Sequence, residues 1–259
     1  MRIALGIEYN GHGFYGWQVQ KDNLPTVQGV LQDALAKVAN EPIFLFCAGR
    51  TDAGVHATGQ VVHFDTNAKR HIDAWLWGTN TFLPPSVVVK WAKHVDYSFH
   101  ARFKANARRY RYVIVNHPIR PAILSSRVTW CYYPLDVERM RIAGNYLLGE
   151  QNFSSFRSSQ CGAKTVTRNI TEFTIQRQGH YIVIEVEANA FLHHMVRNIV
   201  GTLMKIGSGL REPEWMQEVL TAKSRKVAGE TAPADGLYLT HVRYPEPYTF
   251  PLSEEMFLL

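Results

Sequence analysis

The sequence has little cysteine and no long apolar run. Its 259 residues include three cysteines, at positions 47, 131 and 161. Because they are odd in number, far apart and never arranged as C-x-x-C, they favour a reducing cytoplasm over a disulfide framework or a zinc site. No apolar run approaches the roughly 20 residues of a membrane helix, and the first residues reach Glu8 and Asn10 too early for a signal-peptide core. We therefore expect a cytoplasmic protein that has no membrane anchor.

Motifs for cofactors and metals are missing too. The sequence contains no G-x-x-x-x-G-K-[ST] loop and no G-x-S-x-G elbow. It has no H-E-x-x-H pattern, and the adjacent His193 and His194 should point apart. We therefore predict no metal and no organic cofactor, and nothing indicates a serine nucleophile.

Positive charge is concentrated after residue 100. The net charge is +6, yet residues 1–100 hold eight Lys or Arg and eight Asp or Glu. Three later windows, 101–127, 151–171 and 188–211, contain no carboxylate, and such windows suit a phosphate backbone. Aromatic residues that could stack on bases lie in or beside them: Phe99, Phe103, Tyr110, Tyr112, Phe153 and Phe156. A solvated basic face is the alternative, but three such windows with aromatic residues favour nucleic acid.

Apolar periodicity predicts two halves of similar element order. The first half has expected strands at 2–9, 43–48, 59–66 and 86–95, and helices at 27–39 and 71–81. The second has expected strands at 108–116, 127–133, 168–177, 180–188 and 237–244, and helices at 136–148, 191–206 and 213–222. This order predicts an α+β fold of two ferredoxin-like (βαββαβ) lobes, 1–98 and 99–259, whose antiparallel sheets meet at a central catalytic cleft. We expect residues 245–259 to form a loosely held tail.

The densest polar segment is AGRTDAGVH, from Ala48 to His56, between two predicted strands. Its glycines permit a tight turn and close approach by a ligand. Arg50 lies two residues from Asp52 and can hold that carboxylate ionised, as a nucleophilic or basic role requires. An ordinary Asp-x-Gly turn is the alternative, but the crowding of Arg, Thr, Asp and His in one short loop favours catalysis by Asp52.

Arg197 is a second candidate, because the predicted helix around it is apolar over most of its surface. An arginine there must reach out to solvent or meet a carboxylate, since an unpaired buried charge is too costly. Both interpretations stay open. The sharper hypothesis pairs Arg197 with Asp52, with His193, one turn earlier, facing the same way.

The third candidate is the segment RRYRY, from Arg108 to Tyr112. In a strand, Tyr110 shares one face with Arg108 and Tyr112, and the two remaining arginines share the other. One face would then stack on bases while the other contacts phosphates, as in RNA-binding sheets. A sheet whose tyrosines pack inward is the alternative.

The segment AGRTDAGVHATGQVVHF, residues 48–64, closely resembles the signature of the tRNA pseudouridine synthase A (TruA) family. Further matching blocks occur in family order at 7–11, 14–18, 99–103, 108–112, 152–156, 191–201 and 232–237. The resemblance spans nearly the whole chain, with no departure at a catalytic position. It implies a homodimer that converts uridine to pseudouridine at positions 38, 39 and 40 of tRNA, in the anticodon arm, without a cofactor.

The resemblance also implies roles for individual residues. Asp52 matches the nucleophile, Arg50 and Arg197 its charge partners, and Tyr110 the ring that stacks on the target uracil. The apolar surround that such a ring needs is expected to include Leu237. The block at 99–103 matches a segment that helps to extrude the base, through Phe99, His100, Arg102 and Phe103. Looser patterns give Arg70 and the stretch from Gln160 to Lys164 as RNA contacts.

The reaction breaks the N-glycosidic bond and rejoins the uracil to the same ribose through carbon. No redox change occurs and no atom is added, so no cofactor is required. An ionised Asp52 can attack the anomeric carbon of the sugar or the uracil ring, and the sequence leaves both routes open. Two rival interpretations remain: a non-catalytic RNA-binding protein, which does not explain the Arg-Thr-Asp loop, and a carboxylate hydrolase such as a glycosidase or nucleosidase, which needs a second carboxylate or a metal.

Overall fold

The structure is a computed structural model that describes residues 1–21, 24–159 and 161–251. The chain forms two compact units: the first combines Met1–Arg108 with the chain from Tyr238 onward, and the second is Arg109–Leu237. The predicted α+β class is confirmed, since helices accompany sheets that are largely antiparallel. No described helix has both the length and the apolar character needed to span a membrane.

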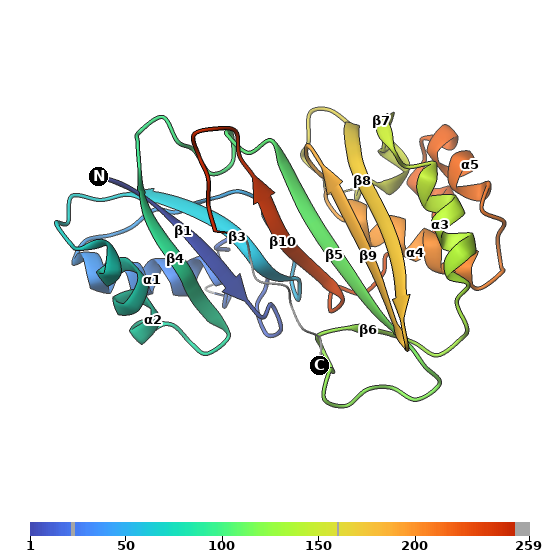
Figure 1. The fold of residues 1–259 in the computed structure, drawn as a ribbon, viewed down its shortest axis with the longest axis horizontal. Helices are drawn as coiled ribbons and strands as arrows, with labels where there is room; N and C mark the ends of the chain where they lie inside the picture. The colour runs from blue at the N-terminus through green and yellow to red at the C-terminus, as the bar shows by residue number, and fades with distance from the viewer. Residues whose placement is uncertain (22–23, 160, 252–259) are drawn as a thin grey trace. The chain divides into compact units, whose positions relative to one another are not determined.

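The first unit follows the predicted β-α-β-β-α-β order and then gains one more strand (Figure 1). Its elements are β1 (Arg2–Tyr9), α1 (Val27–Ala39), β2 (Phe46–Cys47), β3 (His56–Asp65), η1 (Ala74–Gly78), α2 (Thr79–Phe82), β4 (Val87–Val95) and β10 (Leu237–Arg243). Strand β1 is antiparallel to both β3 and β4. Strand β3 also pairs with β2 in antiparallel fashion and with β10 in parallel fashion. The pairing with β10 joins the chain from Tyr238 onward to the first unit, and the expected division between residues 98 and 99 stays a prediction.

Helix α1 illustrates how local sequence sets the elements of this unit. The hydroxyl of Thr26 accepts a hydrogen bond from the Gly29 N–H at 3.2 Å and so caps the first turn. Asn40 ends the helix in the left-handed conformation, φ 57°. The predicted strand at 43–48 is shorter than expected, with two paired residues. The predicted helix at 71–81 exists, but its middle is the π-helical turn η1.

The second unit begins within β5, and its elements are traced in Figure 1. They are β5 (Ala107–Asn116), β6 (Thr129–Cys131), α3 (Val137–Asn145), β7 (Gly149–Asn152), η2 (Ser154–Phe156), β8 (Thr167–Gln178), β9 (Tyr181–Ala188), α4 (Met195–Gly207), α5 (Trp215–Ala222) and η3 (Arg225–Val227). The sheet order is β5-β9-β8-β7, with β6 parallel to β5 at its edge. Helix α3 packs against β8 and α4.

The hairpin of β8 and β9 confirms the prediction for 168–188, and Gly179 adopts the left-handed conformation at its turn, φ 57°. Strand β7 was not predicted. The prediction for α4 was wrong at its start: His194 is left-handed, φ 63°, so the helix begins only at Met195. His193 therefore precedes the helix and does not occupy its face one turn before Arg197.

Candidate functional site

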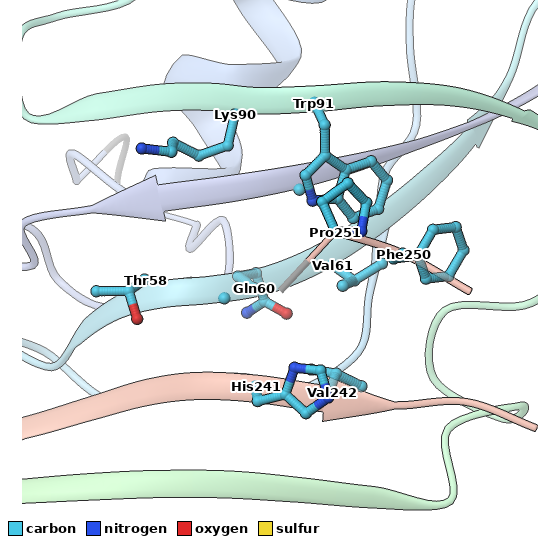
Figure 2. A pocket seen from close by; sticks show the side chains of 11 residues that line it. Thr58, Gln60, Val61, Lys90, Trp91, His241, Val242, Phe250 and Pro251 are labelled. Carbon is cyan, nitrogen blue, oxygen red and sulfur yellow. The ribbon is translucent and has the colours of Figure 1, made fainter. Parts of the chain in front are cut away.

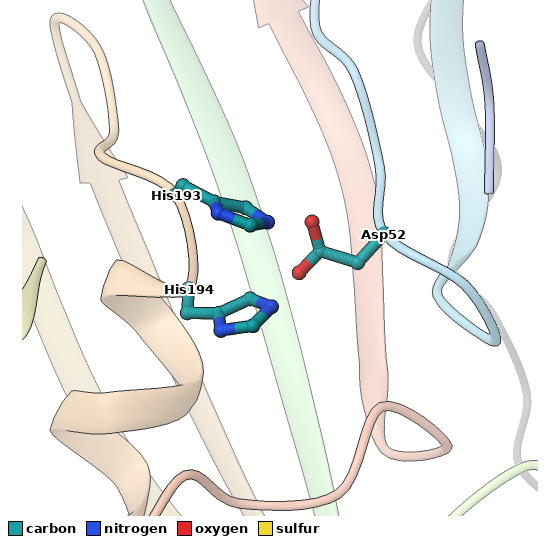
Figure 3. Close-up of side chains that lie close together, drawn as sticks. All are labelled: Asp52, His193 and His194. Carbon is teal, nitrogen blue, oxygen red and sulfur yellow. The ribbon is translucent and has the colours of Figure 1, made fainter. Parts of the chain in front are cut away.

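Asp52 lies on the loop between β2 and β3 of the first unit, and its side chain is half-buried (Figure 3). The preceding residue, Thr51, is held on two sides. Its hydroxyl is hydrogen-bonded to the hydroxyl of Tyr9 at 2.8 Å, and its carbonyl accepts the N–H of Trp17 at 3.0 Å. The N–H of Val55 donates to the Asp52 carbonyl at 3.1 Å. The backbone that carries this carboxylate is thus fixed before and after it.

Glycines of the loop after β1 support the Asp52 loop at close range. A Cβ atom on Gly16, whose φ is +89°, would lie 2.8 Å from the Thr51 carbonyl oxygen. A Cβ on Gly11 would lie 2.0 Å from the Val55 carbonyl oxygen. Gly13 has a similar φ of +83° but meets no atom within 4 Å. The three glycines share G-x-G-x-x-G spacing, yet no described helix begins directly after them, so they support the loop and do not form a dinucleotide fingerprint.

Two buried polar residues of β3 complete the support of this loop. Gln60 is fully buried; its Nε2 donates to the Gly49 carbonyl at 2.6 Å, and its Oε1 accepts the Gly49 N–H at 3.4 Å. His56 accepts the N–H of Gly11 on Nδ1 at 2.9 Å, and its ring stacks on Tyr238 with centroids 4.6 Å apart. The histidine of the polar segment is therefore a buried support for the loop.

Arg50 is exposed, and in the described part of the chain its side chain forms no hydrogen bond and no ion pair. The expected ion pair with Asp52 is therefore not present in this structure. Arg108 has the better defined contact with the loop. Its Nη2 donates to the Ala48 carbonyl at 3.0 Å and to the Arg102 carbonyl at 2.7 Å.

Phe99 belongs to the core of the first unit. It is fully buried, with ring centroids 5.2 Å from Tyr244, 4.9 Å from Tyr248 and 5.4 Å from Phe250. None of its ring is accessible in this structure, and the expected contact of Phe99 with the substrate stays a prediction.

The residues after Phe99 are accessible. Phe103 is 76% exposed, its ring centroid lies 4.3 Å from that of His100, and the Arg102 guanidinium lies 5.7 Å from it. His100 is half-buried, and burial lowers the pKa of its imidazole. This cluster offers an aromatic and a cationic surface, as stacking on a nucleobase requires.

His63 lies beneath this cluster and was missed by sequence reasoning. Its Nδ1 accepts the Ala101 N–H at 3.2 Å, so it must be neutral to make this bond. Burial, together with the positive charges of His100 and Arg2, lowers the pKa of His63 to about 4.

On β5 of the second unit, the tyrosines pack inward. Tyr112 is fully buried, and its hydroxyl donates to the Pro233 carbonyl at 2.8 Å. Burial raises the pKa of that hydroxyl. Tyr110 is 8% exposed, with the ring of Phe191 packed edge-on at 4.9 Å. The inward-packing alternative holds for both residues, although a small part of Tyr110 stays accessible.

The two arginines on the other face of β5 are paired with carboxylates. Arg109 forms ion pairs with Glu172 and, at 3.2 Å, with the nearly buried Glu187. Arg111 pairs with Glu185 at 2.9 Å. The predicted phosphate contacts from this face are not supported, because these guanidinium groups already have counter-charges.

Arg197 lies half-buried on α4, and its Nε donates to the Ala232 carbonyl at 2.8 Å. The Ala232 N–H donates back to the Arg197 carbonyl at 3.1 Å, so helix and segment are joined at two points. The guanidinium is thus held in place and does not simply reach out to solvent. Leu237, 5% exposed, follows Gly236, where a Cβ would lie 2.6 Å from the Val113 carbonyl oxygen.

The remaining predicted residues are His193, Arg70, Lys164 and Gln160. His193 and His194 precede α4 (Figure 3), and the His193 N–H donates to Cys161 Sγ at 3.4 Å. Arg70 and Lys164 are both exposed. Gln160 lies outside the described residues.

The first unit contains a cavity of about 180 Å³ away from the Asp52 loop, with Trp91, Phe250 and His241 among its lining (Figure 2). The rings of Trp91 and Phe250 stack at 4.8 Å. Gly6 makes room for the indole, since a Cβ there would lie 2.1 Å from Trp91 Nε1. The described part of the expected tail, 245–251, is therefore packed on the sheet; residues 252–259 lie outside the described residues.

Sequence reasoning missed the residues that support the Asp52 loop. In the sequence, nothing distinguishes Tyr9, Trp17 and Gln60 from ordinary strand or loop residues. In the structure each is at most 2% exposed and either bonds the loop or packs behind it. The one available signal was Gln60, a polar side chain at a position that strand alternation directs into the core.

Known proteins resemble this chain along most of its length. A sequence model of the family described as tRNA pseudouridine synthase matches residues 6–104 and 143–245. The chain is 57% identical over 251 residues to tRNA pseudouridine synthase A of Shewanella sp. (strain MR-4), covering 97% of this chain and 96% of the relative. It is 56% identical over 253 residues to that of Photorhabdus laumondii, covering 98% and 96%, and 57% identical over 251 residues to that of Yersinia pestis, covering 97% and 95%.

A solved structure, described as a crystal structure of a Cbf5-Nop10-Gar1 complex, is 12% identical, covers 92% of this chain and 48% of its own, and has a TM-score of 0.40, too low to bear on the fold. The sequence matches decide the family. Both the Asp52 loop and helix α4 fall within the matched ranges, whereas 108–112 does not. The resemblance stated from the sequence is thereby confirmed: the chain belongs to the tRNA pseudouridine synthase family and is an isomerase that converts uridine in tRNA to pseudouridine.

Proposed function

We propose that this isomerase acts on uridines 38, 39 and 40 in the anticodon arm of tRNA, with Asp52 as its nucleophile. The observation that carries the proposal is the Asp52 loop: a half-buried carboxylate on a backbone that Tyr9, Trp17 and two close-packed glycines hold rigid. An ordinary Asp-x-Gly turn would not need such support. The curated relatives, named tRNA pseudouridine synthase A, support the same assignment.

Both chemical routes open to Asp52 balance without an oxidant or a reductant. In one, the carboxylate bonds to the anomeric carbon of the ribose as the glycosidic nitrogen leaves. In the other, it adds to the uracil ring, and the glycosidic bond between that ring and the ribose then breaks. In each route the uracil turns, forms a carbon–carbon bond to the same ribose, releases the proton from that ring carbon and frees the enzyme carboxylate. The ionised form of Asp52 starts both routes.

We assign the surrounding roles as the family resemblance implies. Arg197 serves as a charge partner of Asp52, which suits a guanidinium held by the Ala232 carbonyl. Tyr110 stacks on the uracil, and Leu237 supplies an apolar wall. Arg50 serves as the second charge partner only if its exposed side chain turns toward the carboxylate when RNA binds.

The RNA contacts proposed for the first unit are the accessible groups His100, Arg102, Phe103 and Arg70, and for the second unit Lys164. Phe99 acts from the core as the anchor of this aromatic segment. A uridine must leave its stack before it reacts, which costs a few kcal/mol that stacking and phosphate contacts offset.

We also propose that each unit is a ferredoxin-like lobe and that the enzyme works as a homodimer in the cytoplasm. The β-α-β-β-α-β order of the first unit supports the lobe assignment. Light scattering coupled to size-exclusion chromatography measures the oligomeric state, and a monomer mass at working concentration would refute the dimer.

One experiment tests the proposed function. The protein is incubated with unmodified tRNA and no added cofactor, and the RNA is digested to nucleosides. Pseudouridine is expected; free uracil would indicate a hydrolase, and unchanged uridine a binding protein. Transcripts with uridine at only one of positions 38, 39 and 40 then identify the sites, and product from a transcript lacking all three would refute the site assignment.

A further inference from the structure

A second cavity, of about 560 Å³, lies wholly within the second unit and plays no part in the roles assigned above. Every lining residue has a polar or charged side chain, and the lining comes from the η2 region, the start of α4 and the η3 region. The lining residues are Ser154, Arg157, Ser158, Ser159, His194, Asn198, Arg225 and Thr231. Of the residues described around this cavity, two are arginines and none is Asp or Glu.

The cavity is built around Asn198, which is fully buried. Its Oδ1 accepts hydrogen bonds from Arg225 Nη2 at 3.1 Å and from the Thr231 hydroxyl at 2.7 Å. Its Nδ2 donates to the Phe156 carbonyl at 2.8 Å. Arg225 Nη2 is also within 3.1 Å of the Thr231 hydroxyl. Arg225 is therefore anchored at one nitrogen by a buried amide, and this anchoring keeps its guanidinium in a fixed position.

The remaining donors of this guanidinium have no acceptor among the described residues. Within the described chain, Nε and Nη1 of Arg225 form no hydrogen bond, and the residue forms no ion pair. Arg157 is similar: its Nη2 donates to the Cys161 carbonyl at 2.6 Å, and it forms no ion pair with any described carboxylate. Both residues are half-buried, and burial lowers the pKa of Arg225.

Some arginines of the same unit have a counter-charge, whereas others, such as Arg168 and Arg177, bond carbonyl and amide oxygens and form no ion pair with a described carboxylate. Arg109, Arg111, Arg139 and Arg141 each form an ion pair with a glutamate. Two half-buried positive charges beside one cavity, without a counter-charge, are costly unless an anion binds there. Guanidinium groups with free donors match the oxygens of a phosphate, and hydroxyl groups of serine add further donors.

We propose that the Arg157–Arg225 cavity binds a backbone phosphate of the tRNA substrate. The proposal rests on the proposed function in that its ligand is an RNA strand. The volume admits a phosphate together with its ribose, and Arg157 lies in the stretch 151–171, which lacks carboxylates. The two guanidinium groups hold the phosphate oxygens, so the cavity fixes one point of the RNA backbone.

The test measures binding of unmodified tRNA to the full-length protein by fluorescence anisotropy between 50 and 300 mM KCl. Arg157→Gln and Arg225→Gln should each raise Kd about three- to tenfold and lower the slope of log Kd against log salt by roughly 0.7–0.9, the change for one lost phosphate contact. Arg141→Gln is the matched control: it removes an arginine of the same unit that already pairs with Glu138, so its slope should equal that of the wild type.

Arg225→Lys distinguishes an effect on RNA binding from an effect on folding. It keeps the positive charge and loses the guanidinium nitrogen that bonds Asn198 and Thr231. We expect it to melt at a lower temperature yet retain most of the wild-type slope. If both Gln variants keep the wild-type slope, with or without a lower Tm, the arginines are structural and the proposal is overturned. The same holds if inorganic phosphate raises the wild-type Tm in an Arg157-dependent way while tRNA slopes stay unchanged, since the cavity would then hold only a small anion.

Activity distinguishes failure of this site from failure of the proposed function. At saturating tRNA, Arg157→Gln should form pseudouridine with a kcat within about twofold of the wild type and a raised KM, since only uniform binding is lost. A kcat that falls as much as kcat/KM would overturn a pure binding role. A wild-type protein that binds tRNA with the expected slopes but forms no pseudouridine would refute the proposed function and leave the phosphate site standing.

Discussion

The Asp52 loop of the first unit and the Arg157–Arg225 cavity of the second are held in place by different means. The loop is fixed mainly through its backbone, by hydrogen bonds to Thr51 and Val55 and by glycines that leave no room for a Cβ. The cavity is fixed by side chains that converge on one buried amide, Asn198. A reacting carboxylate must sit within a fraction of an ångström of its target, whereas a phosphate contact tolerates more adjustment. The support of each site matches that need.

The contrast should be greatest when the Asp52 carboxylate itself is changed. Asp52→Asn keeps the shape of the side chain and removes the nucleophile, so kcat should fall by at least about 10⁴-fold. The Kd for tRNA and the Tm should stay close to wild type. Rates come from single-turnover formation of pseudouridine with the variant in excess, and normal turnover would end the nucleophile assignment.

Backbone support is tested by two glycines of one loop. Gly16→Ala forces a positive φ on alanine and presses its Cβ against the Thr51 carbonyl, so we expect a loss of roughly 3 kcal/mol in unfolding free energy and a marked fall in kcat. Gly13→Ala has the same conformational cost without the clash, so it should lose about 1 kcal/mol and keep its kcat. Equal kcat values in the two variants would show that contact with Thr51 does not position Asp52.

Replacing an arginine that forms an ion pair should lower stability, whereas replacing one that forms none should weaken RNA binding. Arg109→Gln removes the ion pair of the nearly buried Glu187, which should lower the free energy of unfolding by about 2 kcal/mol in urea titrations. Its salt slope for tRNA should match the wild type, in contrast to Arg157→Gln. A reduced slope for Arg109→Gln would mean that RNA displaces the carboxylates and that this face of β5 binds phosphate after all.

The last effect is a pH dependence carried by His63. Its pKa is about 4 in the folded chain and near 6.5 unfolded, so its neutral form stabilises the fold above pH 6.5. That contribution is lost as pH falls from about 6.5 to 4, on the order of 2 kcal/mol. His63→Asn keeps an acceptor for the Ala101 N–H and cannot titrate, so it should lose less stability than the wild type between pH 7.5 and 4.5. Equal losses in urea unfolding would contradict this role.

The sequence predicts the elements of this fold well where apolar periodicity is strong. It fails where an element depends on contacts with residues distant in the chain. Helix α1 was predictable because Thr26 caps it and its apolar residues repeat at helical spacing. The late start of α4 was not, since His194 gives no signal for a positive φ. The membership of β10 in the first unit depends on pairing with β3, which local sequence does not encode.

The candidate site divides in the same way. The loop around Asp52 was recognisable because chemistry restricts both residue type and spacing within a few residues. Phe99 and Tyr112 read as possible stacking groups, and only packing shows that both are buried. The residues that line the cavity of Arg157 and Arg225 come from four separate stretches of chain. The sequence of one stretch does not predict that the other three lie beside it.

The parallel pairing of Tyr238 and Leu239 with β3 bears on how the protein is made. A ribosome must release residues 109–237 before the first sheet can receive its last strand. The second unit, by contrast, is continuous in the chain and can fold as it emerges. The start of β3, directly after the Asp52 loop, thus keeps an unpaired edge until β10 has been synthesised, and a nascent chain cut before residue 238 should expose that open strand edge to chaperones.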